Sequence, residues 1–469
     1  MRYVSTRGAA PALAFDDVLL AGLARDGGLY VPDTWPELTA GDLSAMARLD
    51  YAELTARVLG RFVDGTVAED DLAAIVADAY RGFAHAAVAP LKQLGANHWL
   101  MELFHGPTLA FKDLPLQVVG RLFDHVLARR GQRLTIVGAT SGDTGSAAME
   151  ACRDRDALEV FILFPEGRVS EVQRRQMTTV DARNVHAIAI RGTFDDCQDL
   201  VKAMFNDIAF RDRHALSAVN SINWARIAVQ VAYYVWAAVA LGAPSRAVSF
   251  AVPTGNFGNI FAAHAARKMG LPIAGLAVGT NRNDILWRFL GSGELALGTV
   301  EPSLSPSMDI QVSSNFERLL FELWDRDGAA LAQAMAEFRR EGRLAVGDAR
   351  WRRATEMFGR HRVDDAETLA TIRRAWQATG EVLDPHSAIA VATAEACRGD
   401  PAVPMVALAC AHPAKFPDAV ERATGIRPAL PGRLSDLMTR DERVAVLPND
   451  LATVQEYVAA HGARQEVAA

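Results

Sequence analysis

The short segment Thr254-Gly255-Asn256-Phe257-Gly258-Asn259 is rich in glycine and asparagine. It follows an apolar stretch typical of a buried strand, Val248–Val252, and precedes an apolar helical stretch, Ile260–Met269. Glycine lets the backbone turn tightly, so that successive N–H groups point into one concavity, and a helix N-terminus adds its attraction for anions. A lone G-x-x-G is more often an ordinary turn. Because the segment matches neither the dinucleotide fingerprint nor the Walker loop, we interpret it as a site for a monophosphate.

A second polar turn, Thr140-Ser141-Gly142-Asp143-Thr144-Gly145, separates a predicted strand, Leu134–Gly138, from a predicted helix, Ser146–Arg153. Ser141, Asp143 and Thr144 place two hydroxyls and a carboxylate where the helix starts. All three residue types favour helix caps, so we expect capping to account for one of them. Two hydroxyls and backbone N–H groups beside two glycines also suit the binding of a substrate carboxylate. From the residues alone the two interpretations are evenly balanced.

A lysine with nucleophilic potential lies in the segment His105-Gly-Pro-Thr-Leu-Ala-Phe-Lys-Asp113. Lys112 follows an apolar strand and stands next to Phe111, so partial desolvation would favour its neutral amine, the form that attacks a carbonyl. A surface lysine at a helix start is the commoner case for any single lysine. The predicted phosphate loop on another strand is what makes a functional Lys112 the stronger hypothesis.

A third polar segment, Ala409-Cys-Ala-His-Pro-Ala-Lys-Phe416, follows the apolar stretch that ends at Leu408. Ligands bind at the carboxyl ends of strands in α/β sheets, and Cys410 would place a weakly polar thiol there, although a buried cysteine is usually only a small apolar filler. His386, in Asp384-Pro-His-Ser387, is interpreted as a buried structural histidine. The chain contains no H-E-x-x-H or G-x-S-x-G motif and its eleven histidines are dispersed, so neither a metal site nor a serine hydrolase is expected.

These segments need strands and helices to position them. Residues 1–95 are predicted to be mostly helical, with periodic runs at Tyr51–Val63 and Asp71–Phe83. From residue 97 onward strands alternate with helices, which indicates βαβ units and a parallel sheet covered on both faces. A polar, helix-rich insertion is expected over 284–379, and a buried core helix over Ile227–Leu241. The predicted strands are His98–Phe104, Leu134–Gly138, Glu159–Phe164, Val185–Ile190, Val248–Val252, Ile273–Val278 and Met405–Cys410.

Composition sets the broad class. A chain of 469 residues, half of them hydrophobic, is long enough for two or three domains. The net charge is −7, from 49 basic and 56 acidic residues, without a long basic stripe, so neither nucleic acid nor a membrane surface is an expected partner. The four cysteines are scattered and the N-terminus does not resemble a signal peptide. Both features favour the cytoplasm.

Several motifs together resemble one family, the threonine synthases of the longer branch, among the tryptophan-synthase-β-like enzymes that use pyridoxal phosphate. The resemblance covers nearly the whole chain. It implies a two-lobed α/β fold with a parallel sheet (fold type II) and an extra, mostly helical N-terminal domain. The implied boundaries are 1–95 for the N-terminal domain and 96–460 for the catalytic domain, with a small lobe at about 111–235 and a large lobe at about 96–110 plus 236–460. The motifs are YVSTRG (3–8), DGGLYVP (26–32), HGPTLAFKD (105–113), SGDTG (141–145), SINWAR (221–226), VPTGNFGN (252–259), LDPHSA (383–388) and AHPAKF (411–416).

The resemblance also assigns roles to single residues. Lys112 matches the lysine that holds the cofactor as a Schiff base. Gly255, Asn256, Phe257 and Asn259 match the loop around the cofactor phosphate, in which Gly258 serves the turn. Cys410 stands where the family usually has a threonine facing the pyridine nitrogen; the thiol is a weaker hydrogen-bonding partner but, like threonine, brings no negative charge. Ser141, Asp143 and Thr144 are implied for substrate binding, with Asp143 orienting the loop or taking the substrate amine. Asn223, Arg226 and Arg282 are proposed for the substrate phosphate.

The activity implied by the resemblance is the conversion of O-phospho-L-homoserine and water into L-threonine and phosphate, with Lys112 as the proton-shuttling base. Three other functions remain open at this point. They are a phospho-lyase that releases 2-oxobutyrate, a dehydratase acting on serine or threonine, and a cofactor-binding homologue without catalysis. The products released would distinguish them. The sequence leaves both a monomer and a homodimer open.

Overall fold

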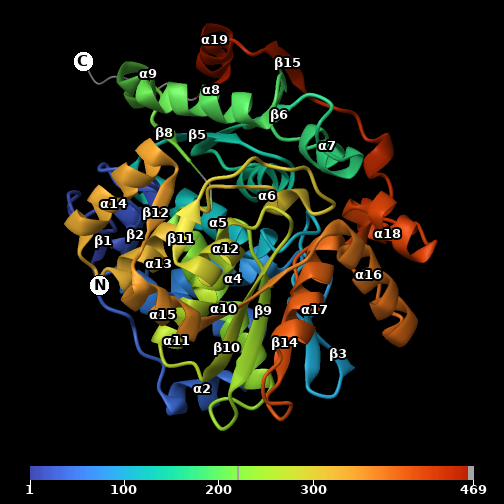
Figure 1. Ribbon diagram of the computed structural model, residues 1–469. Coiled ribbons are helices and arrows are strands. Elements are labelled where there is room, and N and C mark those ends of the chain that lie inside the picture. The colour runs from blue at the N-terminus through green and yellow to red at the C-terminus, as the bar shows by residue number, and fades with distance from the viewer. Residues whose placement is uncertain (219–220, 463–469) are drawn as a thin grey trace. The chain divides into compact units, whose positions relative to one another are not determined.

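The structure is a computed structural model that describes residues 1–218 and 221–462 (Figure 1). Two compact units make up the chain. The first unit comprises Met1–Leu19, Leu23–Phe111 and Ser221–Pro428. The second comprises Leu20–Gly22, Lys112–Asn220 and Ala429–Ala469.

The first unit is built on a six-stranded sheet in the order β13-β10-β9-β14-β4-β3. All neighbouring strands are parallel except β3 and β4, which are antiparallel. Because β9 and β14 are parallel neighbours, the loops that follow them emerge at the same edge of the sheet, as ligand sites in α/β proteins require. The strands are β3 (Leu91–Gly95), β4 (His98–Glu102), β9 (Val248–Pro253), β10 (Ile273–Thr280), β13 (Phe358–Arg362) and β14 (Met405–Ala409).

Buried helices cover this sheet. Helix α17 (Pro385–Cys397) packs on strands β9, β10 and β14, and helix α10 (Trp224–Ala240) packs on α11 (Gly258–Lys268). The core helix predicted over Ile227–Leu241 is confirmed, since α10 is buried along nearly its whole length. The remaining elements after α11 are α12 (Ile285–Ser292), β11 (Glu294–Ala296), α13 (Phe316–Leu323), α14 (Gly328–Glu341), β12 (Arg343–Ala345), α15 (Asp348–Met357), α16 (Asp365–Thr379) and α18 (Pro417–Thr424).

Most of the N-terminal region, apart from Leu20–Gly22, groups with the first unit. Its helix α3 begins and ends where the periodicity predicts, at Tyr51 and Val63, and packs against α10. Aromatic rings fill this contact: the ring of Phe62 lies 5.7 Å from that of Trp224, and Tyr51 lies 5.5 Å from Trp236. The other elements here are β1 (Tyr3–Ser5), α1 (Phe15–Ala21), β2 (Tyr30–Pro32), α2 (Ala40–Met46) and α4 (Glu69–Tyr80).

The second unit holds a five-stranded sheet in the order β15-β7-β6-β5-β8, parallel throughout. Helices α8 and α19 pack together over one face (Figure 1). Val137, Phe161 and Ile188 of the strands form one hydrophobic cluster with Leu200 and Val454 of these helices. The strands are β5 (Leu134–Ala139), β6 (Leu158–Pro165), β7 (Val185–Arg191), β8 (Leu216–Ser217) and β15 (Ala445–Pro448). The helices are α5 (Asp113–Arg130), α6 (Asp143–Cys152), α7 (Glu171–Thr178), α8 (Phe194–Asn206), α9 (Ile208–Arg213) and α19 (Leu451–His461).

The limits of the units differ from the boundaries expected for the two lobes. Helix α10 groups with the first unit and not with the small lobe, because its apolar surface packs on α3 and α11. Residues from 429 onward group with the second unit, because β15 pairs with β7. Strand β13, inside the predicted helix-rich insertion 284–379, extends the six-stranded sheet by pairing with β10.

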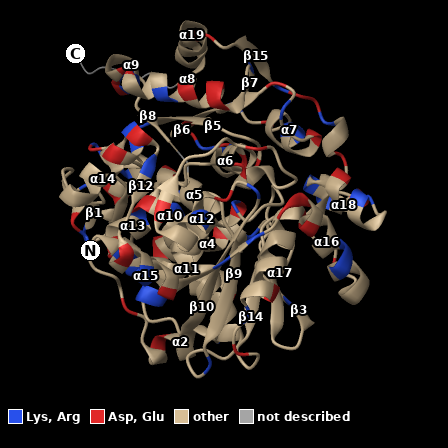
Figure 2. Cartoon of the chain, in the orientation of Figure 1, with Lys and Arg blue, Asp and Glu red and all other residues tan. Residues whose placement is uncertain are grey.

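Charged residues are spread over the described parts of both units. Figure 2 shows Lys and Arg interspersed with Asp and Glu on the helices, whereas strands β9, β10 and β14 carry no charged residue. Among the helices of the described residues, none combines the length and apolar character needed to cross a membrane.

Candidate active site

Helix α11 starts in the turn that follows β9, with Phe257 at its N-cap position. The φ angle of Phe257, 61°, lies in the left-handed region, which is unfavourable for a residue with a Cβ atom. Its buried ring compensates by packing edge-on against Phe316, at 5.0 Å, and Phe358, at 5.6 Å. A phenyl ring cannot accept a hydrogen bond as a capping residue does, so the first N–H groups of α11 remain available for an anion.

The peptide groups of this turn have a fixed direction. The carbonyl oxygen of Gly255 accepts a hydrogen bond from the Ser313 hydroxyl at 2.7 Å, and the Asn256 carbonyl accepts one from the Asn315 N–H at 3.1 Å. In a trans peptide the C=O and N–H bonds point in opposite directions. The N–H groups of Asn256 and Phe257 therefore face away from the 313–315 segment, as a shared anion site would require.

Gly255 is needed because the chain comes very close at this point. A Cβ atom there would lie 3.2 Å from Met308 Cα and 3.3 Å from the Ser307 carbonyl oxygen, both backbone atoms. Glycine fits here without strain, whereas a residue with a Cβ atom would require the neighbouring backbone to shift by a few tenths of an ångström. Segment 307–315 therefore backs the turn along its length.

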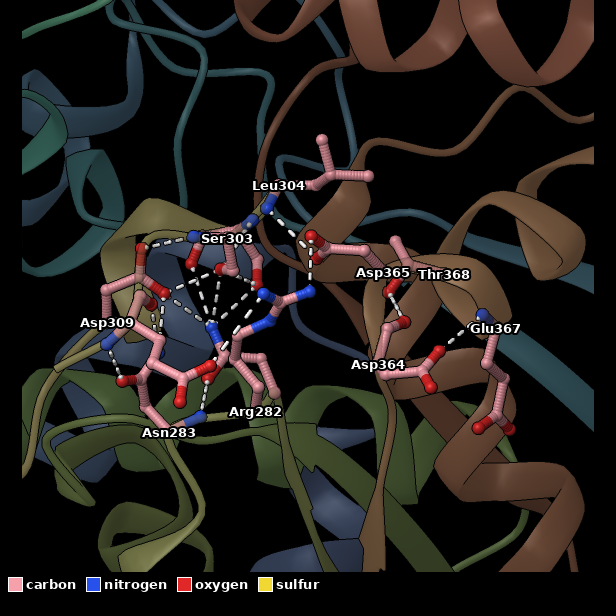
Figure 3. Close-up of polar contacts among 12 residues, drawn as sticks. Arg282, Asn283, Ser303, Leu304, Asp309, Asp364, Asp365, Glu367 and Thr368 are labelled. Atoms are coloured by element: carbon pink, nitrogen blue, oxygen red, sulfur yellow. Dashed lines mark hydrogen bonds and ion pairs between the residues drawn. The ribbon is translucent and has the colours of Figure 1, made fainter. Parts of the chain in front are cut away.

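A polar cluster around Asp309 holds that backing segment in place (Figure 3). Asp309 Oδ1 accepts hydrogen bonds from the side chains of Asn281 (2.7 Å), Asn283 (2.9 Å) and Ser303 (2.6 Å). Burial raises the pKa of Asp309, while the Ser303 and Asn281 hydrogen bonds oppose this effect. The cluster ties the loop after β10 to the segment that supports Gly255.

Asn259 and Cys410 meet at the carboxyl edge of the sheet. Asn259 Nδ2 lies 3.8 Å from Cys410 Sγ, within range of a hydrogen bond to sulfur. Asn259 Oδ1 accepts from the hydroxyls of Tyr233, at 2.5 Å, and Tyr234, at 2.6 Å. Cys410 is buried, with 6% of its surface exposed. The structure thus brings together the predicted phosphate loop and the predicted ring-nitrogen partner.

The segment that leads to Lys112 is fastened to the same edge. The N–H of Phe111 donates to the carbonyl oxygen of Cys410 at 2.8 Å, and the buried Lys415 ammonium donates to the Thr108 carbonyl at 2.7 Å. His412 adds a backbone hydrogen bond to Leu109 at 3.0 Å. Segment 108–111 therefore has a fixed course up to the residue before Lys112.

Within the second unit, Lys112 lies at the start of α5 with its side chain 13% exposed. Its Nζ atom is 3.8 Å from Oδ2 of Asp143. The other carboxylate oxygen, Oδ1, accepts a hydrogen bond from the Gln173 amide at 2.9 Å. Asp143 is therefore oriented by Gln173 and faces the lysine amine.

The polar turn before α6 is shaped by Thr140. Its hydroxyl oxygen accepts from the N–H groups of Gly142, at 3.0 Å, and Gly145, at 2.9 Å. Gly142 has a φ angle of 137° and lies so close to Gln173 that a Cβ atom would be 2.4 Å from that side chain. Helix α6 begins at Asp143, three residues before the predicted start, so Asp143 and Thr144 lie in its first turn.

Capping of α6 was expected from Ser141, Asp143 or Thr144, but Thr140 accepts the N–H groups at this helix start. Ser141 and Thr144 remain partly exposed beside the buried Asp143. Two hydroxyls therefore lie at the surface of the turn, next to a carboxylate that is already engaged. This arrangement suits binding of a substrate carboxylate by the hydroxyls and N–H groups.

Of the residues proposed for the substrate phosphate, Arg226 is a buried cation. Its Nε and Nη1 atoms have no hydrogen-bond partner among the residues that the structure describes. Burial lowers the pKa of the guanidinium to about 10. Asn223 is fully engaged, since its Oδ1 caps α10 at Ala225 (3.0 Å) and its Nδ2 donates to the Leu19 carbonyl (2.9 Å).

Arg282 lies in a different setting. Its guanidinium donates to Asp365 at 2.9 Å and lies 3.8 Å from a Glu301 carboxylate oxygen, as Figure 3 shows for the Asp365 contact. The side chain is 37% exposed. Two carboxylates therefore already balance the charge of Arg282.

Several residues that support the site were not predicted from the sequence. Gln173 orients Asp143, and Tyr233 and Tyr234 orient Asn259. Asn315 supports the turn after β9. The two tyrosines offered one clue, because a buried tyrosine hydroxyl in an apolar helix needs a hydrogen-bond partner.

Comparison with known families places three models along the chain. The model described as "Threonine synthase N terminus" matches residues 2–80, "Pyridoxal-phosphate dependent enzyme" matches 85–347, and "Threonine synthase, C-terminal" matches 387–458. The N-terminal match ends before the boundary expected at residue 95. Together the three matches span most of the chain in the order that the motifs indicate.

Three similar proteins match this chain over nearly their full length. The chain is 57% identical to a threonine synthase of Pseudomonas aeruginosa, covering 99% of each chain. A pyridoxal-phosphate-bound threonine synthase structure from Brucella melitensis superimposes with a TM-score of 0.96 at 54% identity, covering 98% of this chain and 99% of that one. For yeast threonine synthase the TM-score is 0.93 at 38% identity, covering 98% of both. The chain therefore belongs to the threonine synthase family of fold-type II, pyridoxal-phosphate-dependent enzymes.

Proposed function

We propose that the enzyme converts O-phospho-L-homoserine and water into L-threonine and phosphate. Its membership of the threonine synthase family supports the reaction class. The observation that most strongly supports a phosphorylated substrate is the setting of Arg226. It is a buried cation with two unpaired polar atoms among the described residues. A buried charge without a partner is costly, so its position is best accounted for by an anion bound during the reaction.

The residues present fit pyridoxal phosphate. The N–H groups of Asn256 and Phe257, with the start of α11, form an anion cradle for its phosphate, and Gly255, Gly258 and Asn259 complete that loop. Lys112 offers the amine for the covalent bond, and Cys410 offers a neutral partner for the ring nitrogen. When bound, the cofactor supplies an electron sink next to the substrate amine, while the protein fixes the orientation.

Lys112 is the proposed base. Its amine would take protons from Cα and Cβ of the bound substrate. Asp143, held by Gln173 and facing Lys112, orients that amine or receives the substrate amine. The two protons would return to Cγ, after phosphate has left it, and to Cα, as water adds its hydroxyl at Cβ; the remaining proton of the water goes to the released phosphate.

The substrate has two anionic ends that need separate binding sites. Ser141 and Thr144, with the N–H groups at the start of α6, are proposed to hold the carboxylate. Arg226 is proposed to hold the phosphate that leaves from Cγ, and Asn223 to position Arg226 by capping the first turn of α10. We assign no substrate contact to Arg282, because its charge is balanced by Asp365 and Glu301.

The direct test is product analysis with purified enzyme and O-phospho-L-homoserine. The proposal predicts one threonine for each phosphate released. Release of 2-oxobutyrate as the main product would identify a phospho-lyase instead. Serine and threonine, supplied as alternative substrates, should remain unconverted, since a dehydratase would consume them.

The cytoplasm is the proposed location. The four cysteines, Cys152, Cys197, Cys397 and Cys410, are all free thiols, which suits a reducing compartment. Fractionation of cells that produce the full-length chain tests this location. Recovery of the protein outside the cytoplasmic fraction would contradict it.

A further inference from the structure

The side chain of Asn259 has two possible orientations, and they give Cys410 opposite roles. If Oδ1 faces the tyrosines, Nδ2 donates to Cys410 Sγ and the sulfur acts as an acceptor. If the amide were rotated by half a turn, its oxygen would face the sulfur and accept the thiol proton. The oxygen and nitrogen of an amide are distinguished by their partners, so the tyrosines decide between the two.

The distances favour the first orientation. Asn259 lies 2.5 Å from the Tyr233 hydroxyl and 2.6 Å from the Tyr234 hydroxyl. Both separations lie within the range of O–H···O hydrogen bonds, that of Tyr233 at its short limit, and both are shorter than N–H···O bonds usually are. The next acceptors are farther, since Gln230 Oε1 is 3.0 Å from the Tyr233 hydroxyl and the Asn259 carbonyl is 3.0 Å from the Tyr234 hydroxyl.

Both tyrosines remain donors over the working pH range. Burial raises the pKa of Tyr233 and of Tyr234 well above the ordinary value, and the nearby Cys410 adds to the effect. Both side chains are completely buried. Each hydroxyl therefore keeps a proton that it can donate to Asn259 Oδ1.

We propose that Tyr233 and Tyr234 are positioning residues that lock the Asn259 amide, so that Cys410 accepts from Nδ2 and directs its own S–H toward the cofactor ring nitrogen. This inference rests on the proposed function, in which Cys410 faces that nitrogen. If the thiol donates its proton in a hydrogen bond, the ring nitrogen must act as the acceptor and therefore carries no proton of its own. The tyrosine pair would thus set the protonation state of the cofactor from a distance, through two hydrogen bonds.

Infrared spectroscopy of the S–H stretching band tests the orientation. The band of Cys410 is identified by subtracting the spectrum of Cys410→Ser, and visible absorbance shows independently whether cofactor is bound. We expect the Cys410 band to shift to lower frequency when pyridoxal phosphate binds. We expect a smaller shift in Tyr233→Phe and Tyr234→Phe, with the wild-type shift retained in Tyr457→Phe, a tyrosine of helix α19.

Three outcomes would overturn the inference. An unchanged Cys410 band with cofactor bound would show that the thiol already donates to Asn259, the opposite orientation. A full shift in the double variant Tyr233→Phe/Tyr234→Phe would show that the tyrosines do not set the amide. Absence of bound cofactor in the visible spectrum would overturn the proposed function, and this inference with it.

Discussion

Oδ2 of Asp143 lies 3.8 Å from Nζ of Lys112, while Oδ1 of the same carboxylate accepts a hydrogen bond from Gln173 at 2.9 Å. One oxygen is thus held in place so that the other faces the amine. Gly142 leaves room for this contact, because any side chain there would collide with Gln173. The carboxylate that faces the Lys112 amine is therefore oriented by a residue of helix α7.

Replacing Gln173 by Ala should lower kcat by about 10-fold, because loss of a hydrogen bond to a charged group corresponds to ~1.5 kcal/mol or more. KM should change little, since Gln173 is not expected to touch the substrate. Steady-state kinetics would measure both constants. Glu171→Ala, on the exposed part of the same helix, is the matched control and should keep wild-type kcat. An equal loss in both variants would show a general effect on α7 and contradict the assignment.

The strands of the two sheets were predictable where they are buried. All seven predicted strands are confirmed, with ends that differ by at most a few residues, because apolar runs bounded by polar turns are a strong signal. Strand β13 was missed because its sequence, FGRHR, is mostly polar at the edge of the sheet. The short strands β8 and β15 are specified by their pairing partners and not by a local pattern.

The candidate site was predictable only where glycine or a helix start marks the chain. The turn 254–259 and its contact with Cys410 follow from neighbouring parallel strands. The supporting partners, such as Gln173 and Asn315, come from segments far away in sequence, and nothing in their local pattern distinguishes them. Asn223 and Arg226 are both predicted for the substrate phosphate, yet the fold engages the Asn223 amide fully and leaves the Arg226 guanidinium with unpaired atoms among the described residues.

Replacing Gly255 by Ala should weaken binding of pyridoxal phosphate by at least about 10-fold, or ~1.4 kcal/mol. The new Cβ would press on the backbone of Ser307 and Met308 and displace the turn. Titration of cofactor-free protein, followed by absorbance, measures the affinity. Gly399→Ala is the matched control, since a Cβ there meets nothing within 4 Å. Wild-type affinity in Gly255→Ala would argue against this turn as the phosphate site.

Replacing Arg226 by Ala should raise KM for the phosphorylated substrate by about 10- to 100-fold, since a charge-assisted hydrogen bond contributes ~1.5–3 kcal/mol. Arg282→Ala should leave KM unchanged, because that guanidinium is paired with Asp365 and Glu301. Initial rates over a range of substrate concentrations would compare the two variants. If KM rises for Arg282→Ala and not for Arg226→Ala, the assignment of the phosphate site is wrong.

The buried His264 should make stability depend on pH. Burial lowers the pKa of His264 from 6.5 to about 3, and both ring nitrogens are without a hydrogen-bond partner among the described residues. Between these values the unfolded chain binds a proton that the folded chain does not. The free energy of unfolding should therefore be independent of His264 above pH 6.5. Below pH 6.5 it should fall with decreasing pH, by up to about 1.4 kcal/mol per pH unit, until the pH reaches the folded pKa.

Denaturant unfolding of wild type and His264→Phe at several pH values measures this effect. The ring of His264 lies between Phe261 and Phe358, so phenylalanine keeps the aromatic contacts without a titrating group. The variant should show a weaker pH dependence below 6.5, whereas His461→Gln, at an exposed position, should behave as wild type. Equal slopes in wild type and His264→Phe would refute the expectation.

The assignment of Lys112 as the residue that binds the cofactor is tested most directly by borohydride reduction of the purified enzyme, followed by peptide mass spectrometry. Reduction makes the bond between lysine and cofactor permanent, so the modified residue is read from the peptide. The predicted result is a pyridoxyl group on the peptide that contains Lys112. A pyridoxyl group on Lys415, the buried lysine that donates to the Thr108 carbonyl, with Lys112 unmodified, would contradict it.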